Sequence, residues 1–304
     1  MFTLVFLAAL GAPEQDVARA VAFLAREVPA WPAENQCYSC HNNGDAARAL
    51  FAAIRGGHNV PEASIDDTLA WLSEPDAWGD QKGEKAFSDE VLARIQFASA
   101  LSDAIDAGLI VERDVLVQAG RLVASNQRDD GSWQLDVSAS IGSPATYGRF
   151  LATATARHVL IAAGRDHFDD ELERADRFLR DTEVKTVLAA AAVLRALSDA
   201  GDAPALRQRG ICQDLIVEGQ APSGGWGPYV TSAPEPFDTA LVLLALVRYG
   251  GNEQLIEQGR RYLLDAQLDD GSWAETTRPA GQLSYAQYIS TTGWALLALL
   301  ATSR

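Results

Sequence analysis

One short motif occurs three times in this 304-residue chain and constrains its fold more than any other feature. Residues 127–133 read QRDDGSW, residues 220–226 read QAPSGGW and residues 267–273 read QLDDGSW. Gln220 and Gln267 lie 47 residues apart, and Gln127 lies 93 residues before Gln220, nearly twice that interval. A recurring interval of this size is the signature of a repeat architecture. One degenerate copy is therefore expected between the first two, near residues 178–183.

The same interval, continued toward the N-terminus, predicts two more turns near residues 80 and 34. The chain has turn-like sequences there, WGDQ at residues 78–81 and NQC at residues 35–37. In each clear copy an amphipathic segment precedes the motif, as at residues 115–125 and 252–266, and a helical segment rich in small residues follows it. The sequence therefore predicts six helical hairpins.

The residue types of the motif suit a tight turn between two helices. Asp-Gly or Gly-Gly supplies a position with positive φ, and the glutamine side chain can bond free backbone groups at a helix end. The tryptophan is expected to pack as an apolar contact between neighbouring hairpins.

Composition supports an all-α class and excludes several partners. Hydrophobic residues make up 48% of the chain without alternating runs of strong β-formers, so most of it is predicted to be helical. The formal charge of −16 and the lack of a Lys/Arg stripe argue against nucleic acid as a partner. No apolar run reaches the roughly 18 residues of a membrane-spanning helix, so no transmembrane segment is expected in the mature chain.

The first residues resemble the apolar core of a signal peptide. Residues 2–10 read FTLVFLAAL and are followed by small residues, although no basic residue precedes them. One interpretation is that residues 1–12 are a signal peptide, that the protein is exported to the periplasm, and that residues 13–304 form a single toroid domain. The other is that these residues pack as an ordinary helix of a cytoplasmic protein.

The three motifs resemble the QW repeats of squalene-hopene cyclases and related toroids of the terpenoid cyclase and protein prenyltransferase superfamily, over about residues 16–303. The resemblance implies an all-α (α/α)₆ toroid of six helical hairpins around one cavity. It also implies that the helices after the QW turns form an inner ring and that chemistry occurs at the rim where they begin. These inner helices would be residues 43–55, 89–107, 146–163, 185–200, 237–249 and 288–300.

In class II cyclases of this superfamily, the middle acid of a DxDDTA motif at the start of an inner helix protonates an alkene. The matching stretch here is EPFDTA at residues 235–240, with Phe237 at the position of that acid. Either Asp238 or Glu235 substitutes as the catalytic acid, or Asp238 and Thr239 merely cap the helix. A second near-match at residues 64–68, SIDDT, is predicted to begin an outer helix instead.

Residues 37–41, CYSCH, match the attachment motif of c-type haem. Cys37 and Cys40 would bind the two vinyl groups, and His41 would be an axial iron ligand. The only methionine is Met1 and no other histidine is well placed, so a haem here is expected to be five-coordinate or to have a sixth ligand other than His or Met. The other histidines are predicted to lie at the opposite rim or late in an inner helix: His58, His167 and His158.

The same segment allows two other interpretations. NQCYS at residues 35–39 resembles the DxCYSFW segment of protein prenyltransferase β-subunits, whose Asp and Cys bind zinc, but Asn35 replaces the Asp. Cys37, Cys40 and His41 could then hold Zn²⁺ or copper with an open fourth position. Alternatively, the cysteines are buried thiols or a disulfide, with a structural or redox use. Cys212 is expected to be a packed hydrophobe.

Three functions are consistent with these features. The first is an exported toroid with a haem c or metal centre at the rim, which binds an apolar isoprenoid or lipid-like ligand or acts in redox chemistry with an unidentified partner. The second is a terpenoid cyclase-like enzyme with a non-standard acid. The third is a lipid- or protein-binding toroid without chemistry. Six aromatic residues are expected either to face the cavity or to pack the core: Phe97, Tyr147, Phe150, Tyr285, Tyr288 and Trp294.

Overall fold

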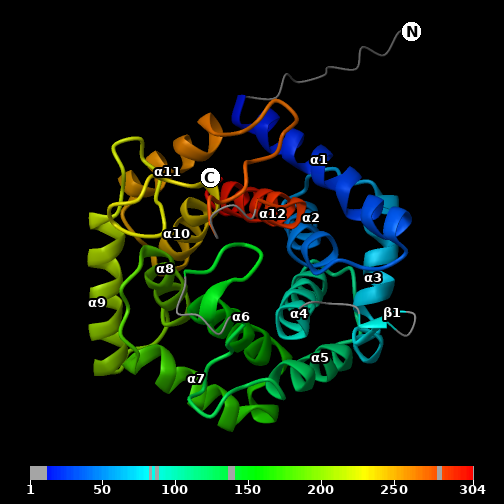
Figure 1. The fold of residues 1–304 in the computed structure, drawn as a ribbon, viewed down its shortest axis with the longest axis horizontal. Helices are drawn as coiled ribbons and strands as arrows, with labels where there is room; N and C mark the ends of the chain where they lie inside the picture. The colour runs from blue at the N-terminus through cyan, green and yellow to red at the C-terminus, as the bar shows by residue number, and fades with distance from the viewer. Residues whose placement is uncertain (1–11, 82–83, 86–88, 136–140, 279–282, 304) are drawn as a thin grey trace, which may run out of the picture.

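The computed structural model describes residues 12–81, 84–85, 89–135, 141–278 and 283–303. Within them an outer ring of helices surrounds an inner ring (Figure 1). Each inner helix contacts the next inner helix along the chain, and the last, α12, contacts the first, α2, which closes the ring. The predicted all-α (α/α)₆ toroid is confirmed.

Outer and inner helices alternate along the chain. The outer helices are α1 (Ala12–Asn35), α3 (Asp66–Leu72), α5 (Asp114–Ala124), α7 (Asp169–Asp181), α9 (Ala203–Glu218) and α11 (Glu253–Asp265). The inner helices are α2 (Ala47–Arg55), α4 (Glu90–Asp106), α6 (Gly148–Ala163), α8 (Val187–Ala196), α10 (Pro236–Tyr249) and α12 (Tyr285–Ala301). A π-helical stretch, η1 (Cys40–Ala46), leads directly into α2.

The remaining elements are short. Three 3₁₀ turns lie between helices: η2 (Glu62–Ser64), η3 (Pro75–Ala77) and η4 (Arg165–His167). Strands β1 (Asp80–Gln81) and β2 (Glu84–Lys85) form an antiparallel hairpin between α3 and α4.

The tryptophan of each motif joins the outer helix before it to the inner helix after it. Trp226 is fully buried, and its Nε1 donates to the main-chain oxygen of Ile216 at 2.7 Å. Its backbone N donates to Oγ1 of Thr239 on α10 at 2.9 Å. Trp133 and Trp273 repeat both bonds. The repeat therefore fixes where each of these inner helices begins relative to its outer helix.

The glutamine of each motif joins its turn to the next outer helix. Gln267 Nε2 donates to the main-chain oxygens of Gly271 and of Asp16, both at 2.9 Å, and Gln267 Oε1 accepts from Arg19 at 2.7 Å. Gly271 has φ +94°, and a Cβ there would lie 2.5 Å from the main-chain oxygen of Arg19. The turn between α11 and α12 is thus bonded to α1, the first outer helix.

The degenerate turns lie where the interval places them. Between α7 and α8 the chain turns at Thr182, and Gln208 of α9 donates to the Thr182 oxygen at 2.7 Å, so a later outer helix supplies the glutamine. The helical segment formed by η1 and α2 begins at Cys40, three residues before the expected residue 43, because Ser39 Oγ accepts from the backbone N–H groups of His41 and Asn42. The prediction of that boundary was wrong.

None of the described helices is long and apolar enough to cross a bilayer. Residues 1–11, which hold nearly all of the expected signal peptide, lie outside the described part of the chain. Export to the periplasm therefore stays a prediction.

Candidate functional site

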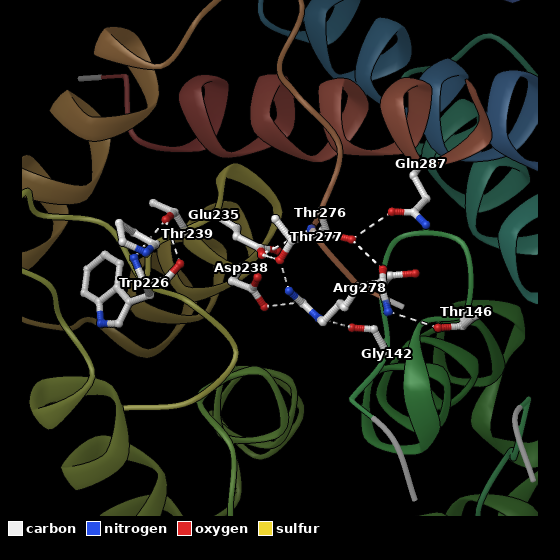
Figure 2. Close-up of polar contacts among 12 residues, drawn as sticks. Gly142, Thr146, Trp226, Glu235, Asp238, Thr239, Thr276, Thr277, Arg278 and Gln287 are labelled. Atoms are coloured by element: carbon white, nitrogen blue, oxygen red, sulfur yellow. Dashed lines mark hydrogen bonds and ion pairs between the residues drawn. The ribbon is translucent and has the colours of Figure 1, made fainter. Parts of the chain in front are cut away.

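Two buried carboxyls share one guanidinium at the start of inner helix α10. Glu235 is the N-cap residue and Asp238 lies in the first turn. Arg278, from the segment before α12, donates from Nη1 to Glu235 Oε2 at 2.5 Å and from Nη2 to Asp238 Oδ1 at 2.6 Å. Figure 2 shows the three side chains together where these segments meet.

Neighbouring segments hold this group in position. Thr277 donates from its backbone N and from Oγ1 to Glu235 Oε1, at 3.2 and 2.5 Å. Arg278 Nε donates to the main-chain oxygen of Gly142 at 3.0 Å, which ties in the loop before α6 (Figure 2). Thr276 Oγ1 donates to Gln287 Oε1 on α12 at 2.8 Å. Arg278 is thus held between two loops and cannot leave the carboxyls without breaking other bonds.

The interpretation of Asp238 and Thr239 as a capping pair is wrong. The N-cap of α10 is Glu235, and its side chain makes no capping hydrogen bond. Asp238 pairs with Arg278, and Thr239 bonds the backbone of Trp226. Both side chains are therefore committed to tertiary contacts.

Asp238 keeps a proton more readily than an ordinary aspartate. Its side chain is fully buried, and this desolvation is the main reason that its pKa is raised to about 7. The positive charge of Arg278 lowers the pKa, while the charge of Glu235 and the hydrogen bond with it raise the pKa. Asp238 Oδ2 has no hydrogen-bond partner among the described residues. The single positive charge of Arg278 cannot balance two buried carboxylates, so the pair of Asp238 and Glu235 retains a proton near neutral pH.

A second carboxyl, Asp45, lies at the start of another inner helix, in η1. Its Oδ2 accepts from Gln96 Nε2 at 2.6 Å and from Ser290 Oγ at 2.8 Å, and its Oδ1 accepts from the Tyr147 hydroxyl. Burial raises the pKa of Asp45, whereas the charge of Arg48 and the three hydrogen bonds lower it. Tyr147 has φ +57°, a strained conformation for a non-glycine residue, at the point where its hydroxyl reaches Asp45.

His41 joins the Asp45 cluster through Ser290. His41 Nδ1 lies 3.0 Å from Ser290 Oγ, which itself donates to Asp45. Desolvation lowers the pKa of His41 to about 4, so the ring is neutral near pH 7. If Nδ1 carries the proton and donates to the serine, Nε2 keeps its lone pair.

The two cysteines of the CxxCH motif are free thiols in different surroundings. Cys37 is half-buried and Cys40 is buried. Desolvation raises the pKa of the Cys40 thiol well above its usual range. In the part of the chain that the structure describes, no three His, Cys, Asp or Glu side chains are grouped so that they could hold a metal ion.

Aromatic side chains separate the two carboxyl groups. Trp294 of α12 makes edge contacts with Phe237, next to Asp238, at 5.9 Å between ring centroids, and with Tyr147 at 5.8 Å. Phe97, Tyr147 and Trp294 are buried, whereas Tyr285 is 40% exposed. The rim of the inner ring therefore combines buried acids with aromatic rings.

The sequence indicated some of these residues and missed others. Glu235 and Asp238 were found by alignment to the motif, and His41 by the CxxCH pattern. Asp45 was missed, although a single acid within the small-residue stretch NNGDAARAL of an inner helix is a usable signal, because burying a charge there requires partners. Arg278 carries no such signal, since it lies in a loop whose position only the fold determines.

No protein-family model matches the sequence, and no curated protein matches it. Solved structures share the fold. A variant of the type II terpene cyclase MstE from Scytonema, in complex with its substrate geranylgeranyl dihydroxybenzoate, matches 95% of this chain and 97% of its own with a TM-score of 0.59 and 14% identity.

Two other similar structures carry different descriptions. The ent-copalyl diphosphate synthase of Streptomyces platensis matches 84% of this chain and 50% of its own, with a TM-score of 0.52 and 17% identity. A possible member of the GH105 family from Salmonella enterica matches 99% of this chain and 96% of its own, with a TM-score of 0.59 and 12% identity. At these identities the likeness establishes the fold, a terpenoid cyclase-like α/α toroid.

Proposed function

We propose that this protein is an acid-catalysed, terpenoid cyclase-like enzyme that binds an apolar isoprenoid in the ring and protonates it with Asp238. One observation carries the proposal: Asp238 and Glu235 share a single guanidinium in a buried position at the start of an inner helix. A general acid must hold its proton near the working pH, and burial beside a second carboxyl favours this.

The proposed reaction needs no cofactor. The O–H bond of Asp238 breaks as its proton bonds to one carbon of an alkene, and the other carbon becomes a carbocation. Aromatic faces stabilise such cations, and Phe237, which precedes Asp238 in the chain, contacts the ring of Trp294. Arg278, 2.6 Å from Oδ1, stabilises the carboxylate that remains. The cation then loses a proton or takes up water, and solvent restores the acid.

The substrate class follows from the fold likeness and from the apolar surroundings. The similar cyclase MstE was solved with a geranylgeranyl-bearing substrate, so polyprenylated aromatic acids and linear polyprenes such as squalene are suitable probes. Incubation of the purified protein with this panel, followed by mass spectrometry, is expected to give products isomeric with the substrate or hydrated.

The variant D238N tests the role of the acid, with E173Q on the exposed face of α7 as its matched control. General acid catalysis contributes roughly 10²–10⁴-fold, so D238N is expected to lose turnover by at least about a hundredfold while E173Q keeps it. Equal turnover in D238N and wild type would reject Asp238 as the acid.

A haem c at Cys37 and Cys40 with His41 as iron ligand is a second proposal, together with the alternative of Zn²⁺ or copper. One observation favours it: Ser290 holds His41 Nδ1, and a hydrogen bond at one ring nitrogen orients the other toward a metal. The buried Cys40 thiol does not fit an attachment site as it stands, because a vinyl group would have to reach it. Haem attachment would require residues 37–41 to move, and so would Zn²⁺ or copper binding, because Cys37, Cys40 and His41 are not grouped as metal ligands in the described structure.

A further inference from the structure

A pocket of about 420 Å³ lies at the end of the ring where the inner helices finish, opposite the rim that carries Asp238. The ends of α2, α4 and α12 contribute to its wall. Pockets of a few hundred cubic ångströms are the usual size of small-molecule sites. The acid chemistry proposed for Asp238 makes no use of this pocket.

Positive charge exceeds negative charge among the side chains that line the pocket. Three arginines line it, Arg48, Arg55 and Arg195, against one carboxylate, Asp103. Arg48 Nε donates to Oδ2 of Asp103 at 2.7 Å, so this carboxylate is paired with Arg48. Within the described residues, neither Arg55 nor Arg195 takes part in an ion pair.

Arg48 supplies the observation that points to a ligand. Its side chain is only 4% exposed, yet its Nη1 has no hydrogen-bond partner among the described residues. Asp45 Oδ1 lies 3.9 Å from Nη1, which is beyond hydrogen-bonding distance. Buried donors are normally satisfied, so Arg48, which lines the pocket and keeps one guanidinium nitrogen unpartnered, has hydrogen-bonding capacity left for an anion.

The surroundings of Arg195 also favour a bound anion. The pKa of Arg195 is lowered to about 10, first by burial and then by the positive charge of Arg48, whereas the charge of Asp103 raises it. Arg195 therefore lies partly buried near a second positive charge, and a bound anion would stabilise both arginine charges.

Helix dipoles explain only part of this charge. Arg55 and Arg195 lie in the last turns of α2 and α8, where positive charge is favourable. Arg48 lies in the middle of the continuous inner helix of residues 40–55, so the partial charge at the helix end does not account for it.

The rest of the wall is apolar. Ala52, Leu244, Leu297 and Leu300 line the pocket beside the arginines. We propose that the pocket binds a small organic oxyanion with an apolar tail, whose phosphate or carboxylate head lies against Arg48 and Arg195 and whose tail lies against the leucines. Guanidinium groups match both heads with paired hydrogen bonds.

Isothermal titration calorimetry with four probes tests this proposal: octyl phosphate, nonanoate, inorganic phosphate and octanol. At least one of the two amphiphilic anions is expected to bind, and the tighter one identifies the head group. Inorganic phosphate and octanol are each expected to bind at least about tenfold more weakly, because each lacks half of the contacts.

The variant R195Q separates binding from folding, because Arg195 makes no hydrogen bond to any described residue that its loss would break. R195Q is expected to keep the wild-type melting temperature and to weaken the amphiphile roughly tenfold or more, whereas R207Q on the exposed face of α9 leaves affinity unchanged. R48Q is expected to weaken binding and also stability, since it releases Asp103.

The proposal is overturned if neither amphiphile binds, if R195Q binds as tightly as R207Q, or if inorganic phosphate or octanol matches the amphiphile. These outcomes do not depend on Asp238, because D238N is expected to bind the amphiphile as wild type does. Failure of the acid chemistry and failure of the anion site are therefore distinguishable.

Discussion

Arg278 lies 2.6 Å from the Oδ1 atom of Asp238 although forty residues separate them in the chain. The same guanidinium bonds Glu235, so one positive charge serves two buried acids. The two carboxyls therefore retain a proton near neutral pH, and the free energy of unfolding is expected to depend on pH.

The first prediction concerns the pH dependence of D238N. The pKa of Asp238 is about 7 in the folded chain and about 4 in the unfolded chain. A raised pKa adds stability that is fully present below about pH 4 and is lost as pH rises through about 7. The free energy of unfolding of wild type, relative to that of D238N, is therefore expected to fall by on the order of 3 kcal/mol between about pH 5 and 8.

Urea denaturation of both proteins at a series of pH values measures this difference. The D238N curve serves as the baseline, because all other titrating groups are common to both chains. Curves that stay parallel from pH 5 to 8 would contradict the raised pKa.

The second prediction concerns Arg278. R278Q leaves two carboxyls buried without a counter-charge, and breaking a buried ion pair costs about 3–5 kcal/mol. The loss in free energy of unfolding is expected to be largest near pH 8 and smaller near pH 5, where protonation removes the repulsion. R177Q removes an exposed arginine that pairs with Glu173 and is expected to cost under about 1 kcal/mol. Equal losses in the two variants would show that Arg278 does not balance the acids.

The repeat determined how much of the fold could be predicted. The interval between Gln127, Gln220 and Gln267 predicted six hairpins and the order of the rings, because each motif makes the same bonds to its two helices. The first inner helix was misplaced by three residues, since Ser39 caps it and no repeat residue marks its start. The repeat interval thus predicts which helices exist, but it does not predict the residues at which local hydrogen bonds make them begin or end.

The site was predicted less completely, for a physical reason. Asp238 could be found because it lies within a motif. The prediction that it caps α10 was wrong, because its side chain pairs instead with Arg278, which lies in a loop. Arg278 and Gly142 meet Asp238 only through tertiary structure. A pattern that is local in sequence cannot reveal a charge balance formed by three distant segments.

The third prediction concerns the closure of the ring at Gly271. Its φ of +94° disfavours any side chain, and a Cβ would lie 2.5 Å from the main-chain oxygen of Arg19 on α1. G271A is expected to lower the free energy of unfolding by roughly 2–4 kcal/mol. G210A within α9, where a Cβ meets nothing within 4 Å, is expected to be neutral or to stabilise by up to about 1 kcal/mol. Thermal unfolding of both variants checks the contrast, and a G271A protein as stable as G210A would show that the last turn does not need to touch α1.

The fourth prediction concerns the CxxCH segment. If haem is attached, the protein from an export- and maturation-competent host is expected to show a Soret band and a mass increase of one haem, both lost when Cys37 and Cys40 are replaced by alanine. C212A is the matched control, because Cys212 is buried in α9. A wild-type protein without a Soret band and without stoichiometric zinc or copper would reject the haem and metal proposals together.

The protonation state of Asp238 itself is the most direct test of the acid. Infrared spectra of wild type minus D238N, recorded as pH rises, report the carbonyl stretch of one protonated carboxyl. We expect this band near pH 6 and its loss with a midpoint of about 7. A difference spectrum without the band at pH 6 would mean that Asp238 is already ionised, and the proposed acid would then have no proton to give.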